Sequence, residues 1–174
     1  MEDRKTQILR AAMRVFALYG FRRASMEDVA QESALSRPAL YQYFRNKDDL
    51  VLSCVDLVIE DAFGAAEAAL NGITGARAQV SAYLTAYLVF YHRLLVSGPH
   101  GDAFADVKSH FGEGKLDGAR LRLIARLDEL SGQPATQETG LILSQAGEAL
   151  KMQAPDETTL ARRTAVLVAG LVAA

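Results

Sequence analysis

The stretch from Ser25 to Leu50, SMEDVAQESALSRPALYQYFRNKDDL, constrains the fold more than any other part of the chain, because it contains two helix starts close together. Ser25 and Ser36 are good N-caps, since a serine hydroxyl accepts a hydrogen bond from the free amides of a first helical turn. Asp28 stands three residues after Ser25, where a capping box needs an acceptor. The stretch therefore predicts two short helices joined by a turn at residues 33–35.

The apolar residues of this stretch recur at helical spacing. Met26, Val29 and Ala30 form one buried stripe, and Leu40 and Phe44, four residues apart, form a second. The side chains left on the outer face or edges of the second helix are Arg37, Ala39, Tyr41, Gln42 and Tyr43. Two short helices, a tight turn and hydrogen-bonding side chains on a free face predict a helix-turn-helix, whose second helix fits the DNA major groove.

The segment from about Arg4 to Leu50 resembles the DNA-binding head of the TetR/AcrR family of transcriptional repressors. The resemblance is carried by Met26-x-Asp28-Val29-Ala30, Leu35-Ser36-x-x-x-Leu40-Tyr41-x-Tyr43-Phe44 and Asn46-Lys47-x-x-Leu50. Ala34 departs from the family, which most often has glycine at that turn position, so we expect the turn to avoid a left-handed backbone there. Pro38 also replaces a common glycine, but proline is compatible with an early helix position.

The resemblance implies which side chains touch DNA. The expected DNA-binding residues are Ser25, Ser36, Arg37, Pro38, Ala39, Tyr41, Gln42, Tyr43 and Lys47. Ser25, Ser36 and Tyr43 would contact phosphate, as would Lys47 at the start of the following helix, whose cap is Asn46. Arg37 would read guanine, Gln42 adenine, and Tyr41 a thymine methyl or a phosphate. The alternative is that these are solvated polar residues of a small helical domain.

Composition sets the class of protein. The chain has 174 residues, of which half are apolar, so it is expected to be globular. Cys54 is the only cysteine, so no disulfide within the chain is possible. No apolar run reaches the roughly 18 residues of a membrane span, and the charged N-terminus does not resemble a signal peptide, so we expect a cytoplasmic protein without membrane contact.

The formal net charge of −2 is unusual for a nucleic-acid binder, but the charge is unevenly distributed. Residues 1–50 hold nine Lys/Arg against seven Asp/Glu, and residues 51–174 hold ten against fourteen. The local cations of the head are Arg22, Arg23, Arg37, Arg45 and Lys47. DNA binding would therefore depend on where these cations lie, and a dimer would double their number.

The hydrophobic periodicity predicts an all-α fold of about nine helices, with a small head and a larger body. The family resemblance implies that the head, residues 1–46, binds DNA and that the body, residues 47–174, binds a ligand and dimerises. The helices expected outside the helix-turn-helix cover residues 5–20, 47–70, 76–96, 102–111, 116–130, 136–152 and 156–174. The first of these gives the helix-turn-helix a surface on which to bury its apolar side chains.

The last two predicted helices carry an association signal. Gly140 and Gly147 stand seven residues apart, a spacing of small residues that lets another helix approach closely. The final helix is apolar on every side from Ala165 onward, which is typical of a helix that is buried or covers a partner. The family resemblance implies a homodimer formed by these two helices. The alternative is that they complete the core of a monomer.

An aromatic stripe on the 76–96 helix is the candidate effector site. Its members are Tyr83, Tyr87, Phe90 and Tyr91, and Phe104 and Phe111 of the following helix could face them. In the resembled family the body encloses an apolar cavity, so the implied partner is a small apolar or aromatic effector. Such a stripe is also what an ordinary helical core looks like, but buried tyrosine hydroxyls need partners that a ligand could supply.

No pattern in the sequence supports an enzyme or a cofactor. The three histidines, His92, His100 and His110, show no metal-ligand spacing, and no phosphate-binding loop or nucleophile motif is present. Cys54 is expected to be a small buried residue, with a redox role as the alternative.

The favoured function is a dimeric repressor that a small molecule releases from a near-palindromic operator. The competing hypotheses are a helical adaptor that has lost DNA binding, for which the weak positive charge is the best support, and a small helical enzyme.

Overall fold

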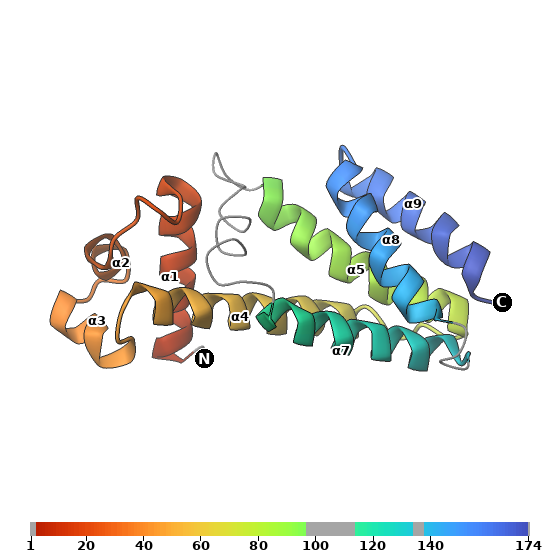
Figure 1. The fold of residues 1–174 in the computed structure, drawn as a ribbon, viewed down its shortest axis with the longest axis horizontal. Helices are drawn as coiled ribbons and strands as arrows, with labels where there is room; N and C mark the ends of the chain where they lie inside the picture. The colour runs from red at the N-terminus through yellow and green to blue at the C-terminus, as the bar shows by residue number, and fades with distance from the viewer. Residues whose placement is uncertain (1–2, 97–113, 134–137, 174) are drawn as a thin grey trace. The chain divides into compact units, whose positions relative to one another are not determined.

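The computed structural model describes residues 3–96, 114–133 and 138–173, and this part of the chain is helical throughout, without strands (Figure 1). Eight helices are described here, in agreement with the predicted all-α class. They are α1 (Arg4–Tyr19), α2 (Met26–Glu32), α3 (Arg37–Tyr43), α4 (Lys47–Ala68), α5 (Ala76–Val96), α7 (Gly114–Ser131), α8 (Thr139–Gln153) and α9 (Glu157–Leu171). The helix predicted over residues 102–111 lies outside the described residues.

Three N-caps of the head are the ones that the sequence predicts. The Ser25 hydroxyl accepts from the amide of Asp28, and the Asp28 carboxylate accepts from the amide of Ser25, which completes the capping box of α2. The Ser36 hydroxyl accepts from Ala39 at the start of α3. The Asn46 side chain accepts from Asp49 at the start of α4, at 2.8 Å. Short helices need such caps because most of their amides have no partner within the helix.

The turn between α2 and α3 contradicts one expectation. Ala34 has φ 52°, so a residue with a Cβ occupies the left-handed region that this turn is expected to avoid. The amide of Leu35 donates to the Ala30 carbonyl, and that of Ala34 donates to Gln31, which is a Schellman ending. Leu35 also packs against the apolar core of the head, and this contact holds Ala34 in the unfavourable region.

The head is built around α1. Ile8, Leu9, Ala12 and Val15 of α1 are buried against apolar side chains of α2, α3 and the start of α4. Gly20 ends α1 with φ 77°, a backbone conformation that glycine adopts without strain. The other buried members of this core are Phe16, Phe21, Ala24, Met26, Val29, Ala30, Leu40, Phe44, Leu50, Val51 and Cys54.

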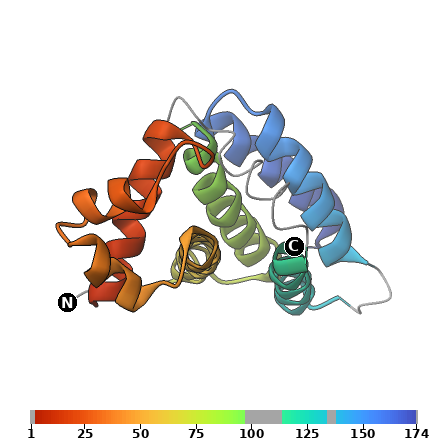
Figure 2. The same cartoon turned by 60° about the vertical axis from the view of Figure 1, so that its left-hand side comes forward.

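The body contains α5, α7, α8, α9 and the later part of α4 (Figure 2). Helices α8 and α9 pack side by side, and α7 packs on α8. The largest fully buried side chains of the body are Phe63, Tyr83, Leu84, Leu88, Leu123, Leu127, Leu143 and Leu160. No described helix is both long enough and apolar enough to cross a bilayer.

The chain forms two compact units, and their boundary within α4 lies later than the predicted boundary at residue 47. One unit comprises the described parts of Met1–Glu60 and Leu94–Glu113, and the other comprises Asp61–Arg93 with the described part of Gly114–Ala174. Helix α4 contributes to both, because Leu50, Val51 and Cys54 lie in the head core while later residues are buried in the body. Where the functional domains divide remains a prediction.

The two glycines of α8 pack within the chain's own body. The amide of Gly140 donates to the Asp128 carboxylate of α7 at 2.7 Å, and a Cβ at Gly140 would collide with the Ile124 carbonyl oxygen. A Cβ at Gly147 would lie 3.2 Å from a terminal methyl group of Leu88 on α5. The predicted close approach is therefore present, but α8 makes it with two different helices of the same chain.

These environments predict that alanine destabilises the protein at Gly140 but is tolerated at Gly147. Gly140→Ala should lower the free energy of unfolding by about 1–3 kcal/mol, since backbone would have to move. Gly147→Ala should leave it within about 1 kcal/mol, because the methyl group of Leu88 can move and alanine favours a helix by about 1 kcal/mol. Urea denaturation of both variants measures the difference. Equal losses would contradict the assigned contacts.

The left-handed turn predicts the effect of changing Ala34. Ala34→Gly should raise the free energy of unfolding by up to about 1 kcal/mol, because the left-handed conformation costs a residue with a Cβ roughly 1–2 kcal/mol and glycine loses about 0.5–1 kcal/mol more backbone entropy. Ala34→Val should lower it. Thermal melting of the two variants checks the order, and a glycine variant less stable than the parent would show that the turn is not left-handed.

Candidate nucleic-acid interface

Two apolar side chains hold α3 on the head. Leu40 is fully buried and Phe44, its C-cap, is 2% exposed, and the Phe44 amide donates to the Leu40 carbonyl. Lys5 of α1 lies over the Phe44 ring, 5.6 Å from its centre, a contact that the sequence did not predict. The helix is only seven residues long, too short to be stable in water by itself. Its orientation is therefore set by this packing.

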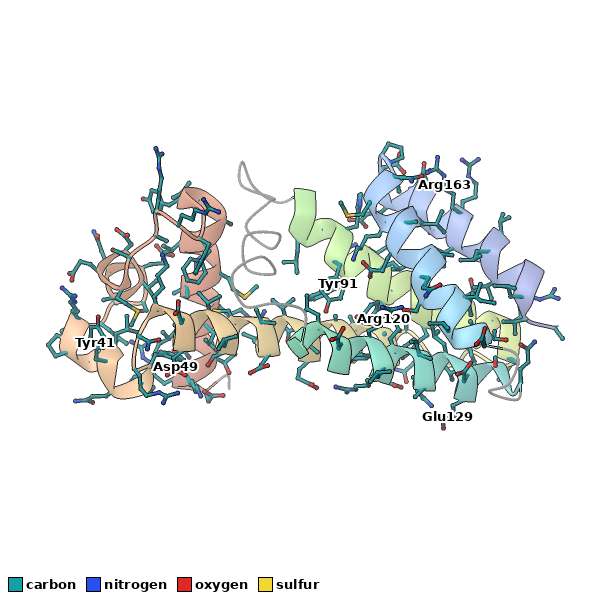
Figure 3. All side chains as sticks on the ribbon, viewed as in Figure 1. Tyr41, Asp49, Tyr91, Arg120, Glu129 and Arg163 are labelled. Carbon is teal, nitrogen blue, oxygen red and sulfur yellow. The ribbon has the colours of Figure 1, made fainter. Side chains whose placement is uncertain are left out.

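The opposite face of α3 is open to solvent. Arg37, Pro38 and Gln42 are exposed, and Tyr41 and Tyr43 are each 41% exposed, a high value for aromatic side chains. Tyr41 lies on the outer side of α3 in Figure 3. Ala39 is half-buried. The structure thus brings the predicted residues of α3 together on one accessible surface, and their contact with DNA remains a prediction.

Arg37 and Tyr41 form a pair on this surface. The guanidinium carbon of Arg37 lies 5.7 Å from the centre of the Tyr41 ring, one helical turn away. A hydrogen bond with Tyr41 is the main cause that raises the pKa of Arg37 above its ordinary value, and the charge of Glu27 on α2 adds to it. The pair restricts both side chains, so Arg37 is presented to a ligand in a limited set of orientations.

Ser25 and Lys47 lie outside α3, at the start of α2 and of α4. Ser25 is exposed but already engaged in the cap of α2. The ammonium group of Lys47 lies 4.6 Å from the centre of the Phe21 ring and donates to the Arg22 carbonyl at 3.4 Å. Partial burial lowers the pKa of Lys47. Lys47 therefore links α4 to the loop after α1 in this structure, whereas the sequence suggested only a phosphate contact.

The predicted effector residues lie in the body core. Tyr83 is 1%, Tyr87 5% and Tyr91 9% exposed, and Phe90 is half-buried. The Tyr87 ring lies 5.3 Å from Phe63 and 5.0 Å from Tyr91, measured between ring centres. Figure 3 shows Tyr91 on α5 within the body. Phe104 and Phe111 lie outside the described residues, so their predicted place opposite the stripe is not tested.

Burial makes these tyrosines harder to ionise. It raises the pKa of Tyr83 and of Tyr91 to about 12 and raises that of Tyr87 further, so all three hydroxyls stay neutral at pH 10, where an exposed tyrosine begins to ionise. Lys151 of α8 lies 5.0 Å from the centre of the Tyr91 ring and pairs with Glu148 at 2.7 Å. The stripe is thus an apolar, neutral surface with charged groups at its border.

The other candidate groups are structural. The Nδ1 atom of His92 lies 3.3 Å from the Lys151 carbonyl oxygen in a buried position, while His100 and His110 lie outside the described residues. Within the described ranges, no cluster of three or more His, Cys, Asp or Glu side chains is placed to hold a metal ion. Cys54 is buried, as predicted, and its thiol approaches the Leu9 carbonyl at 3.7 Å.

Comparison with known proteins shows the family of the head. Residues 8–54 match the family model described as "Bacterial regulatory proteins, tetR family". The head belongs to the TetR family. The resemblance predicted from residues 4–50 is thereby confirmed.

One curated relative is the HTH-type transcriptional activator FasR of Mycolicibacterium smegmatis, which is 30% identical over 89 residues, covering 51% of this chain and 41% of FasR. The chain spans less than half the length of the curated TetR relatives that it matches first.

Solved structures extend the likeness to the body. A TetR-like transcriptional regulator from Rhodococcus sp. RHA1 is 25% identical, with a TM-score of 0.71 over 95% of this chain and 93% of that one. AibR, solved with isovaleryl coenzyme A and operator DNA, has a TM-score of 0.65 and 16% identity, and the match covers 94% of this chain and 96% of AibR. The TetR fold therefore covers nearly the whole chain.

The environment of Cys54 predicts an unreactive thiol. Burial raises its pKa to about 12, so the nucleophilic thiolate is scarce at pH 8. The folded chain should therefore react with a thiol reagent such as dithionitrobenzoate far more slowly than the urea-unfolded chain. Rapid labelling of the folded chain would instead favour the redox role.

Proposed function

We propose that this chain is a homodimeric DNA-binding regulator, a repressor that a small molecule releases from a near-palindromic operator. The observation that carries the proposal is the open outer face of α3, held from behind by Leu40 and Phe44 in a head of the TetR family. Residues 1–46 would bind DNA, residues 47–174 would bind the effector and the second subunit, and the protein would act in the cytoplasm.

Side-chain chemistry supports reading of DNA by α3. Arg37 carries the forked donor that pairs with guanine, and Gln42 offers the donor and acceptor that pair with adenine. Tyr41 presents an aromatic surface suited to a thymine methyl group. Ser25, Ser36, Tyr43 and Lys47 flank these residues at the positions proposed to hold phosphate, and Pro38 and Ala39 complete the contact surface. Phosphate contacts would set the register and base contacts the sequence.

The outer faces of α8 and α9 support a dimer. Val166 is 71%, Met152 68% and Ile142 41% exposed, and Ala165, Ala169 and Gly170 are exposed beside Val166. Exposed apolar side chains on two adjacent helices suit burial against a second copy. A twofold dimer would also present two α3 helices to half-sites about one helical turn, roughly 34–36 Å, apart.

The effector is proposed to be a small apolar or aromatic molecule that meets the Tyr83–Tyr91 stripe. The neutral, stacked rings support this class, and AibR, which shares the fold, was solved in complex with both isovaleryl coenzyme A and operator DNA. An effector changes DNA affinity only by binding two states unequally. FasR is named an activator, so experiments in cells should also test whether this chain activates transcription instead of repressing it. The relatives matched are regulators, and we propose no enzymatic activity.

The proposed contact between Arg37 and guanine predicts the effect of removing the Arg37 side chain. Duplexes selected from a random library by the full-length chain would be titrated by fluorescence anisotropy. Arg37→Ala should weaken binding to the selected duplex about tenfold or more, since a bidentate guanine contact is worth about 1–3 kcal/mol. Arg14→Ala, which removes the same charge from the exposed side of α1 where Arg14 pairs with Glu32, should change binding far less.

Two results would contradict the DNA proposal. Equal losses in the Arg37 and Arg14 variants would show that α3 does not read bases. Failure of the unmodified chain to bind any duplex at low salt, where non-specific binding is strongest, would favour the helical adaptor that has lost DNA binding. That adaptor is otherwise supported only by the net charge of −2.

The dimer proposal predicts a monomer when α9 is charged. Val166→Glu should dissociate the dimer at micromolar concentration, because burying an unpaired carboxylate is costly. Leu121→Glu is the matched control, since Leu121 of α7 is similarly exposed, at 66%, but lies off both C-terminal helices. Sedimentation velocity distinguishes the species. A Val166→Glu dimer, or a monomeric parent, would overturn the proposed interface.

A further inference from the structure

Helices α4 and α7 are linked by charged side chains, although α7 also carries three acidic residues, Asp117, Asp128 and Glu129. Helix α4 carries six acidic side chains and a single cation, Lys47, at its first residue. Helix α7 carries three arginines, Arg120, Arg122 and Arg126. The later part of α4 and all of α7 belong to the same compact unit, so their contacts can be described together.

Arg126 is the centre of a three-way ion pair. Its Nε and Nη2 atoms donate to the two carboxylate oxygens of Glu67 on α4, at 2.9 and 3.0 Å, and its Nη1 atom donates to Glu129 at 2.7 Å. The Arg126 side chain is 27% exposed, and both carboxylates raise the pKa of its guanidinium. A paired, forked arginine that is largely shielded from water makes stronger hydrogen bonds than an isolated surface pair.

Both arginines that face α4 also lie over aromatic rings of the body core. The guanidinium carbon of Arg122 is 4.0 Å from the centre of the Phe63 ring on α4, and that of Arg126 is 6.0 Å from the Tyr83 ring on α5. Phe63 and Tyr83 are each 1% exposed. Helix α7 therefore holds α4 through directional charged contacts next to the proposed effector residues.

Glu67 lies on the same continuous helix that begins at the end of the helix-turn-helix. Leu50, Val51 and Cys54 of α4 are buried in the head core, whereas Phe63 and Ala66, beside Glu67, are buried in the body. A helix transmits a constraint along its length because its backbone hydrogen bonds must break for it to bend. Holding Glu67 thus restricts the movement of α4, the helix against which the helix-turn-helix also packs.

We propose that the Glu67–Arg126 pair is a conformational joint, which fixes the distal part of α4 and thereby sets affinity for the operator but not for DNA in general. This inference rests on the proposed function. With the joint broken, α4 samples more orientations and the fraction of molecules competent for two half-sites falls, which weakens specific binding in proportion. Non-specific binding, which needs no defined spacing, is retained.

The test compares two carboxylates bound to the same arginine. Glu67→Gln removes the charged contact between Arg126 and α4. Glu129→Gln removes an equal charge from α7 itself, three residues after Arg126. Affinities of the full-length variants are measured for the library-selected duplex and for a duplex of shuffled sequence. Glu67→Gln should weaken binding to the selected duplex about five- to tenfold, within the range of typical coupling energies, and leave the shuffled duplex within about twofold. Glu129→Gln should leave both within about twofold.

A second pair and a double variant separate coupling from stability. Glu157→Gln breaks an equally forked pair with Arg93, between α9 and α5, that does not involve α4, and it should not change specific affinity. Glu67→Gln combined with Arg126→Gln should bind no more weakly than Arg126→Gln alone, because Arg126→Gln already removes the contact with Glu67. Should Glu67→Gln melt below the assay temperature, Arg126→Lys, which keeps the charge but loses the fork, gives the same comparison with a smaller loss.

The outcomes distinguish this inference from the proposed function. A parent chain that binds no duplex overturns the proposed function and the joint with it. A parent that prefers its selected duplex, with folded Glu67→Gln and Glu129→Gln variants that bind it equally, overturns only the joint. Parallel losses on selected and shuffled duplexes would also overturn it, since they would show a general defect of the head.

Discussion

Burial of Leu40 and Phe44 in the apolar core of the head is the interaction on which the head depends. A seven-residue helix has too few internal hydrogen bonds to persist alone, so α3 exists because its inner side chains are packed and its first turn is capped by Ser36. The same packing decides which side chains remain outside. Arg37, Tyr41 and Gln42 are available to a ligand because the buried Leu40 and Phe44 hold the other side of α3 in the core of the head.

The body uses a different balance of forces. Its core is apolar and aromatic, but Arg122 and Arg126 lie over the rings of Phe63 and Tyr83. The Glu67 carboxylate of α4 pairs with Arg126. Apolar packing tolerates small rearrangements, whereas forked ion pairs are either made or broken. Both kinds of contact occur along α4, which contributes to head and body, and this combination suits the proposed response to a small molecule.

Much of this structure could be predicted from local sequence signals, and the failures have physical causes. Ser25, Ser36 and Asn46 mark helix starts because capping is a short-range interaction, and α5 has the bounds that its sequence predicts. The expectation for Ala34 is wrong because a long-range contact of Leu35 outweighs the local cost of a left-handed alanine. The folding of Lys47 onto Phe21, and the pair between Glu67 and Arg126, join residues far apart in sequence and leave no periodic signal.

The burial of the only cysteine has a practical consequence for studying this protein. Since Cys54 is shielded inside the head core, a cysteine introduced on an exposed position such as Gln42 or Ala165 would be the single thiol that a spectroscopic probe reaches. Each subunit of an assembly would then carry one label at a chosen place. In the proposed dimer, the distance between two labels at Gln42 would follow the separation of the two α3 helices, in the otherwise native chain, as candidate effectors are added.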